Sequence, residues 1–292
     1  MSTKFLKIGL IGKFGDPGVE DTLDVLSGYL EKKGLSVILD EQTAEMLKDN
    51  SLPTGSREEI GKQCDLAMII GGDGTFLNAA RTLVDYEVPL LGINLGRLGF
   101  LVDISPSSMI ETLDAVLHGD YQEEQRTLLS CDIICEGGMK TTEVAFNDVV
   151  VHKWNVARMI EVEVYIDGQY VNTQRSDGLI VSTPTGSTAY ALSGGGPILH
   201  PSLDSMVLVP ICPHTMSHRP LVIGGNSTVE IVISNNNQDD AQVTCDGQLN
   251  QNLMNGDRIV ISCKDKRIRL IHPKSHNYYE ILRAKLRWAE KL

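Results

Sequence analysis

Residues 66–75 read LAMIIGGDGT: five apolar residues, then a turn of three glycines and one aspartate that opens the next segment. An apolar run of this length without interruption is typical of a strand that is covered on both faces. The segment Thr75–Val84 that follows is predicted to be a helix. In an open parallel sheet, a turn of this kind lies beyond the carboxyl ends of the strands, where ligands bind.

The same alternation of strands and helices extends over the first 120 residues. We expect strands at Phe5–Ile11, Leu35–Leu39 and Val88–Ile93 and helices at Asp21–Lys33 and Ser107–Leu117. Gly34 is suited to end the first helix in a left-handed conformation. Short apolar strands that alternate with helices predict a Rossmann-like α/β domain, with a parallel sheet and helices on both faces.

Beyond residue 120 the apolar period changes from helical to alternating. Ile160–Ile166, Val229–Ile233 and Ile268–Leu270 each alternate apolar and polar residues, which is typical of antiparallel strands. The polar run Asn235–Asp240 is expected to be a hairpin loop. We therefore predict an α/β domain at residues 1–120, a mostly antiparallel all-β domain at 121–275, and a terminal segment 276–292 whose helix, Tyr278–Leu286, returns to the first domain.

Composition narrows the class of protein. The 292 residues include 42% apolar and 22% charged residues, which excludes a disordered, collagenous or coiled-coil chain. No apolar window is long enough for a membrane span, and the apolar stretch at Phe5–Ile11 is too short for a signal peptide, so we expect a cytoplasmic protein without membrane partners. The net charge of −12 disfavours nucleic acid as a partner. Six cysteines without a CxxC pair are expected to be reduced thiols.

Two segments carry the candidate chemistry. In the GGDG turn, glycines let backbone N–H groups approach a phosphate, whereas Asp73 would repel one and suits a hydroxyl or a metal ion. The alternative is a tight turn in which Asp73 caps the helix. Further along, residues 183–190 read TPTGSTAY, and their hydroxyls suit hydrogen bonds to a ribose, an amide or a base edge. Here Ser187 is expected to cap a short helix, and the alternative is a capped helix without a ligand.

Several known motifs are absent. The chain has no P-loop, no GxGxxG dinucleotide fingerprint and no nucleophile elbow. His214 and His218, like His272 and His276, have the spacing of metal ligands on a helix, but nearby prolines argue against helices there. We therefore expect surface or hinge histidines and no metal-ligating residues.

Taken together, these segments resemble the bacterial type of NAD kinase. The resemblance rests on GGDG at 71–74, INLGRLGFL at 93–101, Asn147-Asp148, TPTGSTAY at 183–190, CDGQ at 245–248 and the tail from His272. It extends over nearly the whole chain. GGDG alone is shared with diacylglycerol kinases and phosphofructokinases, whereas its combination with TPTGSTAY is specific.

The resemblance implies an enzyme that transfers a phosphoryl group from ATP to the 2′-hydroxyl of the adenosine ribose of NAD, giving NADP. It also implies a divalent ion, Mg²⁺, bound with ATP, and a homo-oligomer, either a dimer or a tetramer. Because the two motifs fall in different predicted domains, we expect the site in a crevice between them.

The family motifs also imply roles for individual residues of this chain. Asp73 would be the base that contacts the ribose hydroxyl, with Gly74 beside it and Phe100 as an apolar wall. Asn147 and Asp148 would hold the adenosine. The dinucleotide site would be lined by Thr188, Ala189, Tyr190, Ala191, Leu192 and Ser193. Arg175 and Asp177 would lie near the nicotinamide or a subunit contact, and Arg158 and Gln248 are further binding residues.

One position departs from the family pattern, because Asp148 stands where Glu is common. The side chain of Asp is shorter than that of Glu by one methylene, so the family pattern does not define which nucleotide group Asp148 contacts. Two other functions also compete with an NAD kinase. A lipid or sugar kinase could share GGDG, but the negative chain shows no basic amphipathic helix for a membrane surface. A non-catalytic dinucleotide sensor could share the fold, and it would bind NAD without consuming ATP.

Overall fold

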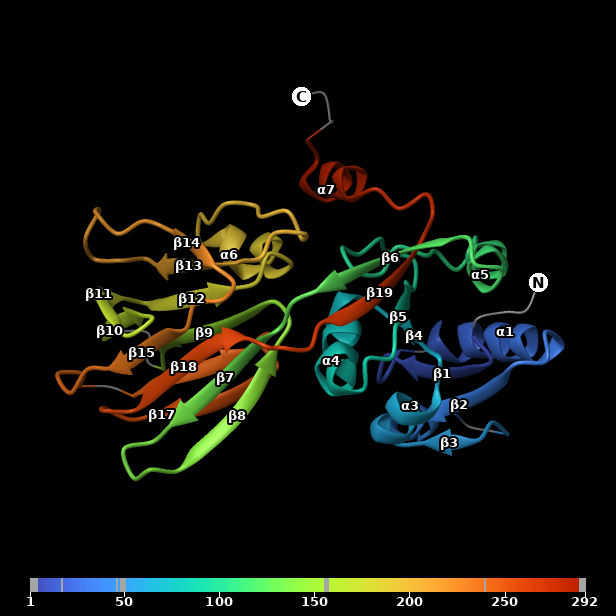
Figure 1. Cartoon of the computed structure of the whole chain (residues 1–292), viewed down its shortest axis with the longest axis horizontal. Coiled ribbons are helices and arrows are strands. Elements are labelled where there is room, and N and C mark those ends of the chain that lie inside the picture. Colours follow the sequence, from blue (N-terminus) through green and yellow to red (C-terminus); the bar gives the residue numbers. More distant parts are fainter. Residues whose placement is uncertain are drawn as a thin grey trace. The chain divides into compact units, whose positions relative to one another are not determined.

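The computed structural model describes residues 5–16, 18–45, 47, 51–154, 158–238 and 240–288 (Figure 1). The chain divides into two compact units. Unit 1 comprises Met1–Gln125 with Ile268–Leu292, and unit 2 comprises Arg126–Arg267. Among the described residues, no helix has the length and apolar composition that a membrane span requires.

Unit 1 is built on a seven-stranded sheet in the order β3-β2-β1-β4-β5-β19-β6. Its strands are β1 (Lys7–Gly12), β2 (Ser36–Asp40), β3 (Thr54–Gly55), β4 (Leu66–Ile70), β5 (Leu90–Ile93), β6 (Tyr121–Arg126) and β19 (Ile268–Pro273). The pairs from β3 to β19 are all parallel. The central strand β4 is completely buried, as its apolar run predicts.

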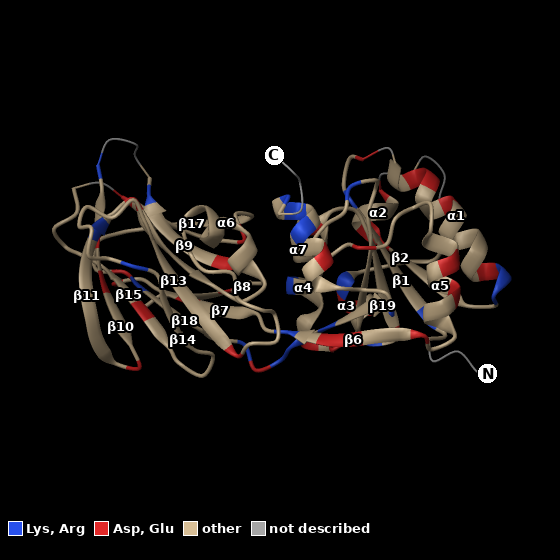
Figure 2. Ribbon diagram, turned by 90° about the horizontal axis from the view of Figure 1, so that it is seen from above, with Lys and Arg blue, Asp and Glu red and all other residues tan. Residues whose placement is uncertain are grey.

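Helices cover both faces of this sheet. The helices of unit 1 that precede β6 are α1 (Gly18–Lys32), α2 (Glu41–Ala44), α3 (Arg57–Gln63), α4 (Asp73–Leu83) and α5 (Met109–Leu117), with a short 3-10 turn at Val84–Tyr86. The helix α7 (Tyr278–Leu286) follows β19. On one face, Ile8 and Leu10 of β1 share a core cluster with residues of α1 and α5. On the other face, Gly9 lies so close to Ile60 of α3 that a Cβ atom would overlap it. Figure 2 shows acidic residues along α1, α5 and β6, in keeping with the net charge of −12.

Unit 2 consists of two six-stranded antiparallel sheets, in the orders β11-β10-β15-β18-β7-β8 and β14-β13-β12-β9-β16-β17. Its strands are β7 (Leu129–Ile134), β8 (Lys140–Ala145), β9 (Asp148–Lys153), β10 (Ile160–Ile166), β11 (Gln169–Ser176), β12 (Gly178–Ser182), β13 (Ser205–Ile211), β14 (Leu221–Gly224), β15 (Val229–Ile233), β16 (Ala241–Cys245), β17 (Leu249–Leu253) and β18 (Arg258–Cys263). Alternate residues of both sheets form one apolar core. A 3-10 turn at Gly186–Thr188 and the short helix α6 (Tyr190–Ser193) follow β12.

The predicted fold class is confirmed, with a mostly parallel α/β unit and an antiparallel all-β unit. The strands at 66–70, 160–166 and 229–233 and the helix at 278–286 have the predicted bounds. The polar run at 235–240 connects β15 to β16, with Asp239 outside the described residues.

One strand assignment is wrong. The alternating stretch at Ile268–Leu270 belongs to β19, which pairs in parallel with β5 in unit 1 instead of with the antiparallel strands. Since β6 and β19 both join the sheet of unit 1, the units divide at residues 125 and 267, whereas the sequence suggests 120 and 275. The segment Ile268–Leu292, which contains α7, is grouped with unit 1.

Candidate functional site

The glycine turn after β4 leads directly into α4. Gly71 donates its N–H to the carbonyl of Ile93 at 2.9 Å, which ties the turn to the end of β5. A Cβ atom at Gly71 would lie 2.6 Å from the Thr75 hydroxyl, so only glycine fits. Gly72 is the N-cap residue of α4, and no side chain caps this helix. The alternative in which Asp73 serves as the helix cap is therefore wrong.

Asp73 instead binds the loop that follows β5. Its two carboxylate oxygens accept one hydrogen bond each, from the backbone N–H groups of Phe100 and Leu101, both at 3.0 Å. A side chain at Gly99 would overlap the Asp73 carboxylate. The carboxylate is thus fixed in orientation while half-buried, and each oxygen keeps capacity to accept a further hydrogen bond.

The other predicted site residues of unit 1 lie at the same place. Gly74 is exposed in the first turn of α4, next to Asp73. Phe100 is half-buried in the loop whose N–H binds Asp73, and the Lys285 ammonium lies 5.8 Å from the centre of its ring. The structure therefore brings Asp73, Gly74 and Phe100 together.

Unit 2 contains a cavity of about 650 Å³ at the centre of its second sheet. Five predicted site residues line it: Asn147, Asp148, Asp177, Ala189 and Tyr190. The remaining lining residues come mainly from β9, β13, β16 and β17.

Carboxylates dominate the charge of this cavity. Asp148, Asp177 and Asp246 all line it, and Lys153 forms an ion pair with Asp177 at 2.7 Å. Such a lining favours groups that donate hydrogen bonds, such as hydroxyl and amino groups, over a phosphate.

The carboxylate of Asp246 organises one end of the cavity. It accepts hydrogen bonds from the backbone N–H groups of Phe146 (2.9 Å), Asn147 (2.7 Å) and Asp148 (3.2 Å). Asp246 and Gly247 both have positive φ angles, 52° and 63°, in the loop between β16 and β17. CDGQ at 245–248 contributes to the family resemblance, but the resemblance alone gives Asp246 no role. The signal that could have revealed it is the Asp-Gly pair directly after a strand, which is typical of a tight hairpin.

Asp148 is almost completely buried, with 4% of its surface exposed. Burial, together with the neighbouring charge of Asp246, raises the pKa of Asp148 to about 7. A carboxyl group of this kind changes its protonation state near neutral pH, which makes it a candidate for ligand recognition.

The hydroxyl groups of TPTGSTAY mostly bind the protein itself. Thr183 donates to the carbonyl of Phe146 at 2.7 Å, and Ser187 donates to that of Pro184 at 2.6 Å and accepts from the N–H of Leu199 at 2.9 Å. Arg126 donates to the hydroxyl of Thr185, and the hydroxyl of Thr188 donates to the Thr185 carbonyl at 3.2 Å. The expected cap by Ser187 is wrong, because Ala189 is the N-cap residue of α6.

These internal bonds hold the segment against Asn147. A Cβ atom at Gly186 would overlap the Asn147 carbonyl, and the Thr183 N–H donates to that same carbonyl at 2.9 Å. The segment therefore acts first as a support for the wall of the cavity, and Ala189 and Tyr190 reach the cavity itself.

The remaining predicted residues of unit 2 lie elsewhere. Arg158 and Arg175 line a second cavity of about 570 Å³, together with His214 and Glu161. Ala191 is fully buried in a small core cluster with Ile180 and Val209. Leu192 is half-buried, and Ser193 and Gln248 are exposed. Arg175 and Asp177, which we expected together, thus line different cavities.

Comparison with known proteins covers both units. The ATP-NAD kinase N-terminal domain matches residues 8–121, and the ATP-NAD kinase C-terminal domain matches residues 146–273. The NAD kinase of Nitrosococcus oceani is 50% identical over 292 residues, 100% of both chains. That of Teredinibacter turnerae is 49% identical over 285 residues, which covers 98% of this chain and 97% of the relative.

Solved structures give the same result. The fold is similar to yeast NADH kinase complexed with NADH, with a TM-score of 0.89 and 25% identity over 99% of this chain and 92% of the other. An NAD kinase from Archaeoglobus fulgidus in complex with ATP has a TM-score of 0.74 and 28% identity over 96% and 98%. With family models matched in both units and a relative half identical over its full length, this chain belongs to the NAD kinase family of phosphotransferases.

Proposed function

We propose that this protein transfers the terminal phosphoryl group of ATP to the 2′-hydroxyl of the adenosine ribose of NAD, giving NADP and ADP, with Asp73 as the general base. The observation that carries the proposal is the half-buried Asp73 carboxylate, held by two backbone N–H groups beside the glycine turn. The similarity to an ATP complex and to an NADH complex supports the two substrates.

The chemical role of Asp73 follows from its geometry. The 2′-hydroxyl donates its proton to an Asp73 oxygen as its own oxygen bonds to the terminal phosphorus and the bond to the ADP oxygen breaks. Phosphoryl transfer passes through a loose transition state, so the orientation of the hydroxyl matters as much as its deprotonation. The hydrogen bonds from Phe100 and Leu101 supply that orientation, because they leave Asp73 no freedom to turn away.

Adenosine recognition is assigned to the acid-lined cavity of unit 2. The amino group of adenine and the hydroxyls of ribose are hydrogen-bond donors, and Asp148 is a buried acceptor on the cavity wall. Asn147 presents both a donor and an acceptor beside it. Thr188, Leu192, Ser193 and Gln248 belong to this proposal on the family motif alone, and Ala191, which is fully buried, would support the site from the core without touching the ligand.

The phosphates need positive charge from another source. We propose that Mg²⁺ arrives with ATP as part of the substrate and offsets the repulsion between the donor and the incoming oxygen. Backbone N–H groups at the start of α4 are suited to phosphate oxygens. We further expect a cytoplasmic homo-oligomer, a dimer or a tetramer, whose size sedimentation would establish.

The test is to assay NADP formation from NAD and Mg·ATP with Asp73→Asn. Loss of a general base lowers turnover by a factor of about 10² to 10⁴, while NAD affinity in calorimetry is expected to stay within about tenfold. Asp24→Asn on the exposed side of α1 is the matched control and should leave both unchanged.

Two outcomes would contradict the proposal. NAD affinity lost in parallel with turnover would make Asp73 a binding residue and not the base. Saturable NAD binding by the unmodified protein without any NADP, even with polyphosphate as donor or NADH as acceptor, would favour a dinucleotide sensor.

A further inference from the structure

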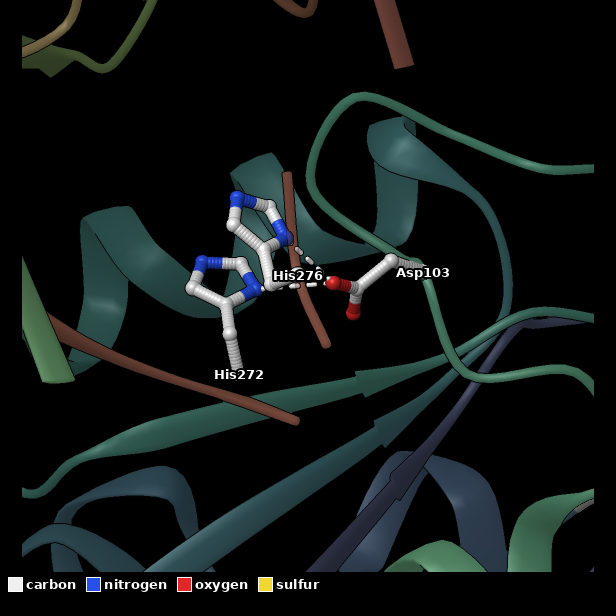
Figure 3. Close-up of side chains that lie close together, drawn as sticks. All are labelled: Asp103, His272 and His276. Carbon is white, nitrogen blue, oxygen red and sulfur yellow. Dashed lines mark hydrogen bonds and ion pairs between the residues drawn. The ribbon is translucent and has the colours of Figure 1, made fainter. Parts of the chain in front are cut away.

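Two histidines and an aspartate of unit 1 converge on one point (Figure 3). His272 lies in β19, His276 lies in the turn before α7, and Asp103 lies in the loop between β5 and α5. One oxygen of Asp103, Oδ2, is 3.1 Å from Nδ1 of His272 and 2.6 Å from Nδ1 of His276. The two imidazole rings stack with their centres 3.9 Å apart.

All three side chains are buried, with 8% of Asp103, 3% of His272 and 8% of His276 exposed. The expectation of surface or hinge histidines is wrong at this pair. Pro273 does prevent a helix, but the turn that follows it brings His276 back beside His272, since the His276 N–H donates to the Pro273 carbonyl at 2.9 Å. A turn, and not a helix, thus brings the two histidines close enough to bind the same ligand.

Buried polar atoms in this cluster remain unused. Oδ1 of Asp103 and Nε2 of His276 have no hydrogen-bond partner within the described part of the chain. A buried polar atom of this kind is unfavourable unless something else satisfies it. Hydrogen bonds within the described part of the chain therefore do not satisfy this buried cluster completely.

The surroundings of His272 resemble the outer shell of a metal site. Its second nitrogen, Nε2, lies 3.1 Å from the carboxylate of Glu124 in β6. Histidines that bind a metal through one nitrogen typically donate the other N–H to a carboxylate, which fixes the ring and increases its basicity. Gln122, also in β6, donates its amide to the carbonyls of Lys274 (2.9 Å) and His276 (3.0 Å) and so holds the turn in place.

We propose that Asp103, His272 and His276 form a binding site for a zinc-type divalent ion, through one carboxylate oxygen and the two Nδ1 atoms. The three ligand atoms lie within 4.8 Å of one another. In tetrahedral zinc sites neighbouring ligand atoms are about 3.3 Å apart, so only small movements are needed. Two imidazoles and one carboxylate favour Zn²⁺ over Mg²⁺, which prefers oxygen ligands and keeps its water.

The ion would connect three segments of unit 1 near the proposed base. Asp103 follows closely on Phe100 and Leu101, whose N–H groups hold Asp73. An ion bound here would link this loop to β19 and to the turn before α7. The site is therefore structural: it stiffens the loop that orients Asp73, and its ion takes no part in phosphoryl transfer.

The experiment is a titration of the full chain, freed of metal with a chelator, with Co²⁺ as a spectroscopic probe. We expect one equivalent to bind with the visible absorption of a tetrahedral site, without a thiolate band, and Zn²⁺ to displace it. Millimolar Mg²⁺ should not displace the bound Co²⁺. Zinc at 100 times its Kd should raise the Tm by about 5 °C.

Variants separate the site from adventitious binding. His276→Gln and Asp103→Asn should abolish the cobalt spectrum, and Glu124→Gln should weaken binding by about 10- to 100-fold. His118→Gln, which replaces an exposed histidine at the end of α5, is the matched control and should bind as the unmodified chain does.

Absence of a tetrahedral cobalt spectrum in the unmodified chain would overturn the proposal, and so would an unchanged spectrum in His276→Gln. If a ligand variant fails to fold, the unmodified chain and Glu124→Gln still decide the question.

Discussion

Replacing Asp148 with Asn should stabilise the protein at neutral pH, and the gain should depend on pH in a defined way. Asp148 is 4% exposed, and burial with the charge of Asp246 raises its pKa to about 7. In the unfolded chain the pKa is about 3.9. This difference of about 3 pKa units means that ionisation of Asp148 destabilises the folded state by about 4 kcal/mol.

The sign follows from the raised pKa. Below about pH 4 the carboxyl is protonated in both states, and the penalty is absent. As the pH rises towards 7, the unfolded chain ionises while the folded protein holds its proton, so the penalty grows and then levels off. Asp148→Asn removes this group. The gap in unfolding free energy between variant and unmodified protein should therefore widen by about 2.5 kcal/mol from pH 5 to pH 8.

Urea denaturation of both proteins at pH 5, 6, 7 and 8 measures this gap, with hydrogen exchange of the β9 amides as a probe of unit 2. Groups that do not interact with Asp148 contribute the same pH dependence to both proteins, so their contribution cancels in the difference. Asp24→Asn on α1, exposed to solvent, is the control and should give a constant gap. A gap that stays within about 0.5 kcal/mol for Asp148→Asn would refute the argument that burial and Asp246 hold this proton.

Four further predictions concern positions whose surroundings are visible in the structure. Gly186→Ala would press a methyl group into the Asn147 carbonyl, so we expect a loss of about 2 kcal/mol or more in unfolding free energy and weaker NAD binding in calorimetry. Gly28→Ala, inside α1 with no atom near its Cβ, should instead stabilise by about 0.5–1 kcal/mol. Gly99→Ala would displace the Asp73 carboxylate and should lower kcat by about tenfold or more while NAD affinity changes little, as steady-state kinetics would show. Ser56→Ala removes the capping box with Glu59 and should lower the unfolding free energy by about 1 kcal/mol without any effect on kcat, which denaturation and turnover assays together would test.

The parts of the fold that sequence predicts well are those decided by neighbours along the chain. The apolar run of β4 and the alternation in β10 and β15 depend only on which faces of a strand are buried, so their bounds follow directly. Asn277, which caps α7, marks the start of that helix in the same way. The class of each unit follows from the period of these segments.

Pairing partners are a different matter, because they are set by contacts between distant residues. β19 alternates at its start as an antiparallel strand would, yet it pairs in parallel with β5, and nothing in its local pattern distinguishes the two. The same limit applies to His272 and His276. Their spacing suggests a helix that Pro273 forbids, and only the path of the turn places both rings beside Asp103.

Two carboxylates, one in each unit, hold backbone from far along the chain. In unit 1, Asp73 holds the N–H groups of Phe100 and Leu101, and in unit 2, Asp246 holds those of Asn147 and its neighbours. The local sequence around an Asp in a glycine turn predicts a helix cap. Asp73 and Asp246 instead each position a loop that carries other site residues. Asn preserves the shape of Asp but presents an NH₂ group to at least one N–H donor, so each substitution should disturb its loop as well as remove a charge. Asp73→Asn and Asp246→Asn should therefore both speed hydrogen exchange at the amides they hold. Gly99→Ala displaces the Asp73 carboxylate but keeps it. If Asp73→Asn lowers kcat more than Gly99→Ala does, the difference measures the action of Asp73 as a base.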